Sequence, residues 1–328
     1  MPQSESFVGP PGWVLAEHFV VPCVPPYRLD LTVAVLRRTP HNPVDVLTGD
    51  GRYLRAFGGP AGPRVCVAYQ PPGTNTLHIA LYRPTVANDE HKAPDEELRE
   101  RIPRMLGTGV DLSSFYAVAV NVPELAPLVV QARGVKPPRY PSLWEAFCNA
   151  VVFQQLSLEA AIATMRRMIA HCSAPLAFGD VQLYPFPAPA KIIETEPEVL
   201  RSFGLSATKV RTLQEVADLL LDGKLTAEEL EALPTADAMA RLTLLRGIGP
   251  WTAAVIMLRG FRRLDVFPAG DSGARRNLRG LLGAAAGPDA EGAAILAALG
   301  PWRGMLYYHL LLWRLSRRGL VNLAASGL

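Results

Sequence analysis

The stretch Leu244-Leu245-Arg246-Gly247-Ile248-Gly249-Pro250-Trp251-Thr252-Ala253 decides the fold of this chain. Two glycines around one apolar residue allow a sharp turn and the close approach of another backbone. Pro250 suits the first position of a new helix, because its φ is fixed and it lacks an N–H. Upstream, Thr235 is a candidate N-cap, and Met239, Leu242 and Leu245 recur on one helical face. The stretch therefore predicts two helices joined by a tight hairpin.

Such a hairpin can grip a nucleic-acid backbone. The free amides at the start of a helix, together with its dipole, attract a phosphate without reading bases. Asp271 follows nineteen residues after Thr252, directly before the predicted helix start Ser272-Gly273-Ala274-Arg275-Arg276. Amides and dipole at that position favour the ionised carboxylate. An aspartate there is commonly only an N-cap, and the capping role is compatible with a chemical one.

This pattern resembles the helix-hairpin-helix DNA glycosylases, most closely the 3-methyladenine DNA glycosylase II group. In that superfamily the hairpin Leu-x-Gly-Ile/Val-Gly precedes a catalytic aspartate, and Leu245, Gly247, Ile248, Gly249 and Asp271 fit this order. The resemblance implies that Asp271 is catalytic. Breaking an N-glycosidic bond builds positive charge on the sugar, which a carboxylate stabilises while it orients or deprotonates the attacking water.

Trp251 indicates which reaction follows base release. In relatives that also cut the DNA strand, a lysine at this position attacks the sugar and forms a Schiff base. Tryptophan cannot do so, and the nearest lysine in sequence, Lys224, lies outside the motif. The resemblance therefore implies a monofunctional glycosylase without lyase activity, with Trp251 in the base pocket; simple core packing is the alternative for this side chain.

Two further segments match the family. Gln154-Gln155-Leu156-Ser157 resembles a segment whose side chain fills the gap left by a flipped base. By alignment Gln155 takes this wedge position and Leu156 is next in line, although an ordinary turn with a buried Leu156 is equally compatible. Pro301-Trp302-Arg303 resembles a segment whose tryptophan lines the base pocket. Purines methylated at N3 or N7 are cationic, and an indole face attracts cations; packing is the alternative for Trp302.

The resemblance also implies the contacts to DNA. The amides of Gly247, Ile248 and Gly249, helped by Thr252, are expected to hold a phosphate. Arg275 and Arg276 are candidates for contact with the DNA backbone, although pairing with acidic neighbours on the protein is equally compatible. Carbonyls of Thr243, Leu245 and Ile248 are expected to bind a structural monovalent cation, Na⁺ or K⁺; no other cofactor is required. Val255 and Ser272 replace aromatic residues of the family's pocket, which leaves the range of substrates open.

Composition agrees with a folded DNA-binding protein. Of 328 residues 49% are hydrophobic and 19% charged, and the net charge is only +3. Residues 241–328 hold twelve arginines, no lysine and four acidic residues, a formal charge of +8. This charge suits the binding of a polyanion, although an arginine face exposed to solvent is the plainer interpretation.

The four cysteines, Cys23, Cys66, Cys148 and Cys172, form no C-x-x-C pair. Free thiols in a reducing cytoplasm are therefore expected rather than a zinc or iron–sulfur site. No signal peptide or membrane span is apparent.

Hydrophobic periodicity predicts an α+β domain over residues 1–122, a small antiparallel sheet with helices, followed by an all-α helix-hairpin-helix glycosylase domain over 123–328. Alternation over 29–35 predicts a strand, as do residues 53–57, 64–69 and 76–82, with turns at 48–51 and 71–73. A helix is expected over 95–106. His78 and His91 are expected to be isolated and are interpreted as structural. Four further helices are predicted over 143–153 (capped by Ser142), over 157–172, and from Ser206 and Thr226 onward.

Together these features predict a monofunctional DNA glycosylase that flips out and hydrolyses alkylated purines of the 3-methyladenine and 7-methylguanine type in base excision repair. Its expected partner is double-stranded DNA with a damaged base, and we expect a monomer in the bacterial cytoplasm, associated with the nucleoid and not with a membrane. Two alternatives remain: a glycosylase for oxidised or deaminated bases, and a non-catalytic helix-hairpin-helix DNA-binding protein.

Overall fold

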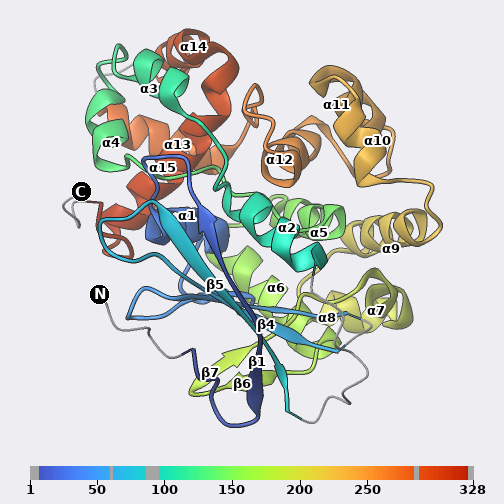
Figure 1. Ribbon diagram of the computed structural model, residues 1–328. Coiled ribbons are helices and arrows are strands. Elements are labelled where there is room, and N and C mark those ends of the chain that lie inside the picture. The colour runs from blue at the N-terminus through green and yellow to red at the C-terminus, as the bar shows by residue number, and fades with distance from the viewer. Residues whose placement is uncertain (1–6, 60–61, 86–95, 284–287, 324–328) are drawn as a thin grey trace.

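A five-stranded antiparallel sheet forms the base of the molecule, and helices stack above it (Figure 1). The computed structural model describes residues 7–59, 62–85, 96–283 and 288–323. The strands run in the order β1-β5-β4-β3-β2, which are Trp13–Pro22, Thr76–Pro84, Arg64–Tyr69, Tyr53–Phe57 and Asp45–Leu47. The three strands predicted after residue 50 are thus confirmed. The turn at 48–51 joins β2 to β3, where Thr48 N–H donates to the Arg52 carbonyl at 2.9 Å.

The strand predicted over 29–35 is wrong, because these residues form helix α1, Leu29–Arg37. Leu29, Val33 and Leu36 pack into one hydrophobic core while Leu31, Ala34 and Val35 pack into a second. A helix that is buried on all sides can carry apolar residues at any spacing, so alternation does not identify a strand here. Strand β1 was not predicted, although it pairs with β5 along its whole length.

The remaining helices largely follow the predictions. Ser142, Ser157, Ser206 and Thr226 each accept an N–H of the helix that they cap. The bounds are α2 Glu96–Leu106, α3 Ser113–Ala119, α4 Ala126–Gln131, α5 Leu143–Phe153, α6 Leu158–Cys172, α7 Pro189–Glu194, α8 Pro197–Ser202, α9 Ala207–Leu221, α10 Ala227–Ala232, α11 Thr235–Thr243, α12 Pro250–Phe261, α13 Ser272–Leu282, α14 Pro288–Leu299, the 3₁₀ turn η2 Gly300–Trp302 and α15 Arg303–Arg317.

Three further details of the fold differ from the predictions. The second part is not wholly helical, because β6, Leu176–Phe178, and β7, Val181–Leu183, form a small hairpin against the outer face of the sheet. Thr235 is the first residue of α11 and not its cap, which is Pro234. His78 is not isolated, since its ring centroid lies 5.6 Å from that of His18. His91 and Asp95 lie outside the described residues.

The hydrophobic cores bind the two predicted domains together. One core joins the inner face of the sheet to α5, α9 and α12, and a second joins α1 to α3, α4 and α15. At the junction, the buried guanidinium of Arg55 pairs with Asp45 of β2 and with Glu145 of α5. The helices α1, α3 and α4 therefore connect both parts, and the boundary at residue 122 stays a prediction.

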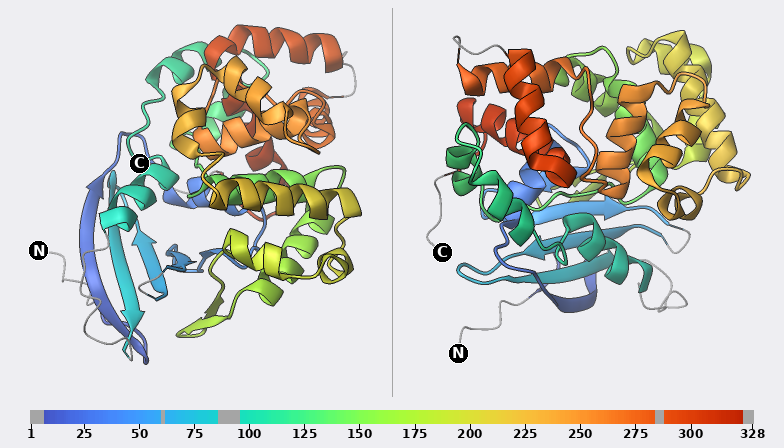
Figure 2. Two further views of the ribbon diagram at one scale, coloured as in Figure 1. Left: turned by 90° about the vertical axis from the view of Figure 1, so that its right-hand side faces the viewer. Right: turned by 90° about the horizontal axis from the view of Figure 1, so that it is seen from above.

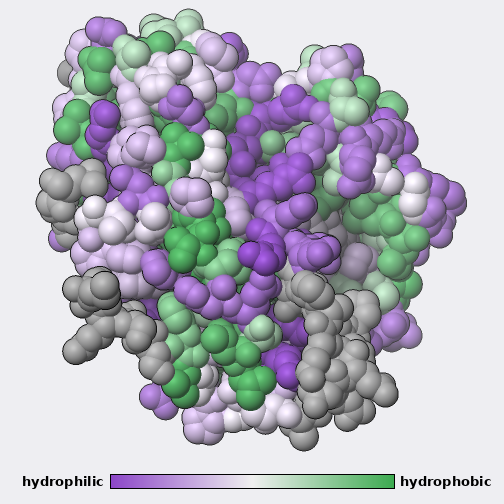
Figure 3. Space-filling view, viewed as in Figure 1, coloured by the Kyte–Doolittle hydropathy of each residue, from purple (hydrophilic) through white to green (hydrophobic). Residues whose placement is uncertain are grey.

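Seen from above, the helices divide into two groups over the sheet (Figure 2, right). One group contains α13, α14 and α15, and the other contains α9, α10 and α11. On the surface, hydrophilic side chains gather between these groups (Figure 3). Within the described ranges, no helix is both long and apolar enough to cross a bilayer, and all four cysteines are free thiols.

Candidate active site

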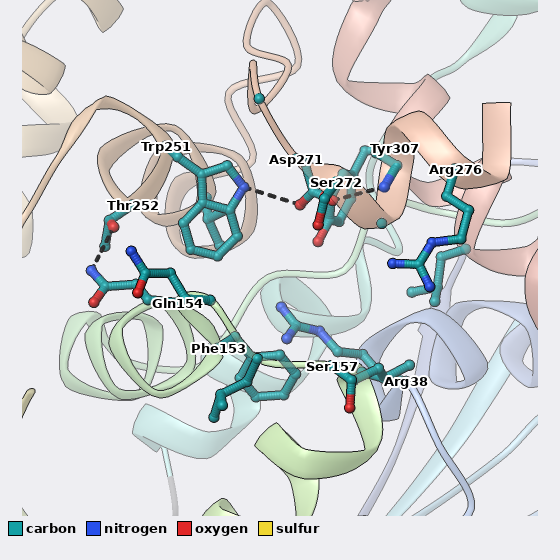
Figure 4. Close-up of a pocket in the computed structure, with 18 of the residues that line it drawn as sticks. Arg38, Phe153, Gln154, Ser157, Trp251, Thr252, Asp271, Ser272, Arg276 and Tyr307 are labelled. Carbon is teal, nitrogen blue, oxygen red and sulfur yellow. Dashed lines mark hydrogen bonds between the residues drawn. The ribbon is translucent and has the colours of Figure 1, made fainter. Parts of the chain in front are cut away.

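A cavity of about 980 Å³ opens where six segments distant in sequence converge (Figure 4). The turn between α5 and α6 forms one wall, and the hairpin with the start of α12 forms another. The end of α1 and the starts of α9 and α13 contribute further lining residues, and α15 completes the lining. A volume of this size accommodates a nucleotide-sized ligand.

Asp271 lies in this cavity at the N-terminus of α13. Its Oδ1 accepts the Ala274 N–H at 2.7 Å, and its Oδ2 accepts the indole Nε1–H of Trp251 at 3.0 Å. The first bond confirms the predicted cap. The positive end of the helix dipole and the two donors stabilise negative charge on the carboxylate. Trp251 is half-buried and lines the cavity, where it was expected. Its hydrogen bond also holds the carboxylate of Asp271, the candidate catalytic residue, in position.

The glycines of the hairpin have different roles. Gly247 has φ +79°, and a Cβ there would lie 2.1 Å from Thr212 Oγ1, so only glycine fits. Gly249 has no atom within 4 Å of such a Cβ and caps α12, whose first residue is Pro250, as predicted. Ile248 departs from the prediction, because its side chain is buried and its N–H donates to the Leu245 carbonyl at 3.1 Å. The amides of Gly247 and Gly249 therefore remain the candidates for a phosphate.

The predicted wedge residues sit at the tip of an exposed turn. Gln155 has φ +54°, a conformation that side-chain-bearing residues rarely adopt, and both Gln155 and Leu156 are exposed and line the cavity. The alternative of a buried Leu156 is thus wrong. Gln154, which was not predicted as a site residue, anchors the turn by donating to the Gly247 carbonyl at 2.9 Å and to Thr252 Oγ1 at 2.8 Å.

Lys209 supports the turn between α5 and α6 from the start of α9. Its ammonium donates to the carbonyls of Val152 at 2.9 Å and Gln154 at 2.7 Å, and burial lowers its pKa. Thr252 is buried and accepts from Gln154, so it supports the turn rather than facing a DNA phosphate as predicted. A strained turn persists only where its surroundings hold it, and here three side chains do so.

Trp302 is not in the cavity, which corrects the prediction. It belongs to the turn η2 and packs against the second core, while Tyr307, one turn into α15, lines the cavity instead. Val255 and Ser272, which stand where the family carries aromatic residues, do line the cavity. Phe153 adds a ring that sequence reasoning missed.

The predicted arginines flank the site. Arg276 lines the main cavity, and Arg275 lines a neighbouring one of about 570 Å³ between α11, α13 and α14. Much of the basic C-terminal charge is used internally: Arg314 and Arg318 pair with Glu159, and Arg263 donates to carbonyls of residues 231 and 233. The plain interpretation of a solvated arginine face is therefore only partly right.

The carbonyls expected to bind a monovalent cation lie at the end of α11 and in the hairpin. The Leu245 carbonyl accepts the Ile248 N–H and retains a second lone pair. Thr243 ends α11, where carbonyls lack helical partners. Neither observation identifies an ion, and this site stays a prediction.

A hairpin that can hold a phosphate, an exposed turn and a carboxylate at the wall of one cavity are the parts of a DNA base-excision enzyme. Comparison with known families gives the same class. Residues 148–298, just under half of the chain, match the model of the HhH-GPD superfamily of base excision DNA repair proteins.

Several of the relatives that match the chain are named DNA-3-methyladenine glycosylase. The chain is 27% identical over 220 residues to a DNA-3-methyladenine glycosylase of Bacillus subtilis, covering 67% of this chain and 72% of that protein. It is 32% identical over 137 residues to DNA-3-methyladenine glycosylase 1 of Schizosaccharomyces pombe, covering 42% of this chain and 56% of that protein. It thus spans little more than half of the yeast relative.

Solved structures agree on the fold. A 3-methyladenine DNA-glycosylase from Archaeoglobus fulgidus superposes with a TM-score of 0.71 at 22% identity, covering 92% of this chain and all of that one. The S. pombe 3-methyladenine DNA glycosylase, solved with abasic DNA, superposes with a TM-score of 0.51 at 26% identity, covering 62% of this chain and 97% of that one. The α+β domain followed by a helix-hairpin-helix domain is therefore confirmed.

Proposed function

We propose that this protein is a monofunctional DNA glycosylase that flips a damaged purine out of double-stranded DNA and hydrolyses its glycosidic bond. The single observation that supports this most is the position of Asp271 in the cavity, held by Trp251 and by the start of α13. Alkylated bases are the proposed substrates, because the relatives are named for 3-methyladenine. The reaction takes place within base excision repair.

The proposed reaction uses few groups. The amides of Gly247 and Gly249 hold a backbone phosphate, and Gln155 or Leu156 fills the space that the flipped base leaves. As the C1′–N9 bond breaks, its electron pair leaves with the base and positive charge builds on the sugar. The Asp271 carboxylate stabilises that charge and takes a proton from the water that attacks C1′. The products are the free base and an abasic site.

The absence of lyase chemistry is part of the proposal. Trp251 occupies the position of the family's lysine, and an indole forms no Schiff base. Lys209 does lie on the cavity wall, but it is only 9% exposed and both of its hydrogen bonds go to backbone carbonyls. An amine held in this way is poorly placed to attack a sugar.

A panel of duplexes tests the proposal. Duplexes with 3-methyladenine, 7-methylguanine, hypoxanthine, 8-oxoguanine or uracil are incubated with the protein, and free base and strand breaks are measured separately. We expect release of alkylated purines, with DNA strand breaks only after the product is treated with alkali. Release of 8-oxoguanine or uracil alone would contradict the substrate class, a borohydride-trapped adduct would contradict the monofunctional claim, and binding without any release would leave a DNA-binding protein.

A further inference from the structure

One charged side chain in the cavity has no role in the chemistry described so far. Arg38 follows the last residue of α1, far from the hairpin in sequence, and is only 4% exposed. It nevertheless lines the same cavity as Asp271 and Trp251. Figure 4 shows its guanidinium beside Phe153 and directed toward the space below Asp271.

The guanidinium of Arg38 has no polar partner among the described residues. Its Nε is buried without a hydrogen bond, and Cζ lies over the ring of Phe153, 4.2 Å from the ring centroid. Burying a charged group without a partner is unfavourable by several kcal/mol, so such a group commonly awaits a ligand. Stacking on an aromatic face leaves the N–H edges of the guanidinium available for that ligand.

The backbone of Arg38 is also unusual. Its φ is +63° at the end of α1, where its N–H donates to the Ala34 carbonyl. Glycine or asparagine commonly occupies such a helix end, because other side chains are strained there. Strain of this kind is concentrated at functional sites. The fold thus tolerates a strained arginine at a helix end that opens into the cavity.

Two buried arginines lie close together at the end of α1. A second buried arginine, Arg259, donates to the carbonyls of Val35 and Leu36 at 2.9 and 3.2 Å, just before Arg38. Burial and Arg259 both lower the pKa of Arg38, while Asp271 raises it. Guanidinium groups stay protonated in proteins nevertheless. Arg38 therefore places a fixed positive charge at the cavity wall, on a segment other than the helix that Asp271 caps.

This charge affects two kinds of purine lesion differently. A purine methylated at N7 is already cationic and departs as a neutral molecule, so a nearby cation gives its departure no help. A neutral purine such as hypoxanthine departs as an anion, with the bonding electrons of C1′–N9 spread over the ring and its oxygen. A preformed donor stabilises such developing charge strongly in a site that excludes water.

We propose that Arg38 binds the departing base and enables excision of neutral purine lesions that carry a hydrogen-bond acceptor, in addition to cationic methylated purines. The inference rests on the proposed glycosylase function and deepens it. The leaving anion takes a proton from solvent, while water supplies the hydroxyl to C1′ and its proton goes to Asp271. Phe153 holds the plane of the guanidinium in place.

Two substrates that share the 6-oxygen but differ in charge test the inference. Single-turnover rates of base release are measured on duplexes with hypoxanthine and with 7-methylguanine, for the wild type and for Arg38→Gln, Arg38→Lys and Arg37→Gln. Arg37 is the adjacent arginine and does not line the cavity, so it is the matched control. Thermal melting of each variant checks that it folds.

We expect Arg38→Gln to lower hypoxanthine release about 100-fold while 7-methylguanine release changes no more than about threefold. Arg38→Lys should recover part of the hypoxanthine activity, because it keeps the charge, and Arg37→Gln should match the wild type. An equal loss on both substrates would show a structural role and overturn the inference. A wild type that releases 7-methylguanine but no hypoxanthine would also overturn it and leave the proposed function standing. Release of neither base, nor of any other lesion, would remove the proposed function itself.

Discussion

Replacing the two hairpin glycines by alanine separates folding from DNA binding. Gly247 has a φ of +79°, and a Cβ added there would lie 2.1 Å from the Thr212 hydroxyl oxygen. The left-handed backbone is unfavourable by about 1–2 kcal/mol for alanine, and the overlap adds about 1–3 kcal/mol as in other overpacked sites. We therefore expect Gly247→Ala to lower the free energy of unfolding by about 2–5 kcal/mol.

Gly249→Ala should behave in the opposite way. A Cβ at Gly249 meets no protein atom within 4 Å, so the free energy of unfolding should stay within about 0.5 kcal/mol of the wild type. That Cβ lies beside the Gly249 amide that we assign to the phosphate, so DNA affinity should fall at least about tenfold. Adding Thr212→Ala to Gly247→Ala removes the hydroxyl and should recover part of the lost stability.

Urea denaturation measures the stabilities, and binding to an undamaged duplex at fixed salt measures the affinities. The reasoning fails if Gly247→Ala is as stable as the wild type. It fails equally if Gly249→Ala loses stability, or binds DNA as tightly as the wild type does.

Three further predictions follow from the site and from the junction between sheet and helices. Trp251→Phe removes the 3.0 Å bond to Asp271 and should slow single-turnover base release about 10- to 100-fold; an unchanged rate would contradict it. Lys209→Met removes the two hydrogen bonds to the turn that carries Gln155 and Leu156 and should slow base release. Lys224→Met, at an exposed position, should not slow it; equal effects of the two substitutions would refute a positioning role for Lys209. Burial raises the pKa of Glu145 from 4.5 to about 7, so the folded state holds a proton that the unfolded state releases, and stability should fall as pH rises from 4.5 to 7. Glu145→Gln should flatten this decline in urea titrations; an unaltered slope would contradict the assignment.

The local parts of the site could be predicted from the sequence. Gly247, Gly249 and Pro250 encode the hairpin through backbone conformation, and Asp271 lies where a helix begins. Each of these features depends on its immediate neighbours in the chain, and the structure places them as expected.

The parts that depend on distant contacts could not be predicted. Arg38 reaches the cavity only because α1 is buried between two cores, and the apolar alternation of this segment indicated a strand instead. Trp302 was expected in the pocket, but a 3₁₀ turn precedes α15 and Tyr307 takes that place. The direction of a side chain near a helix start depends on such turns, and spacing in the sequence does not reveal them.

Asp271→Asn tests the central claim most directly. Asparagine keeps an oxygen that can accept the Ala274 N–H, so α13 stays capped and the fold is preserved. Asp265→Asn, at an exposed position, is the matched control. Single-turnover release of 7-methylguanine should fall at least about 100-fold in Asp271→Asn, with DNA affinity within about threefold of the wild type and the control unaffected. Release at the wild-type rate by Asp271→Asn would contradict the account.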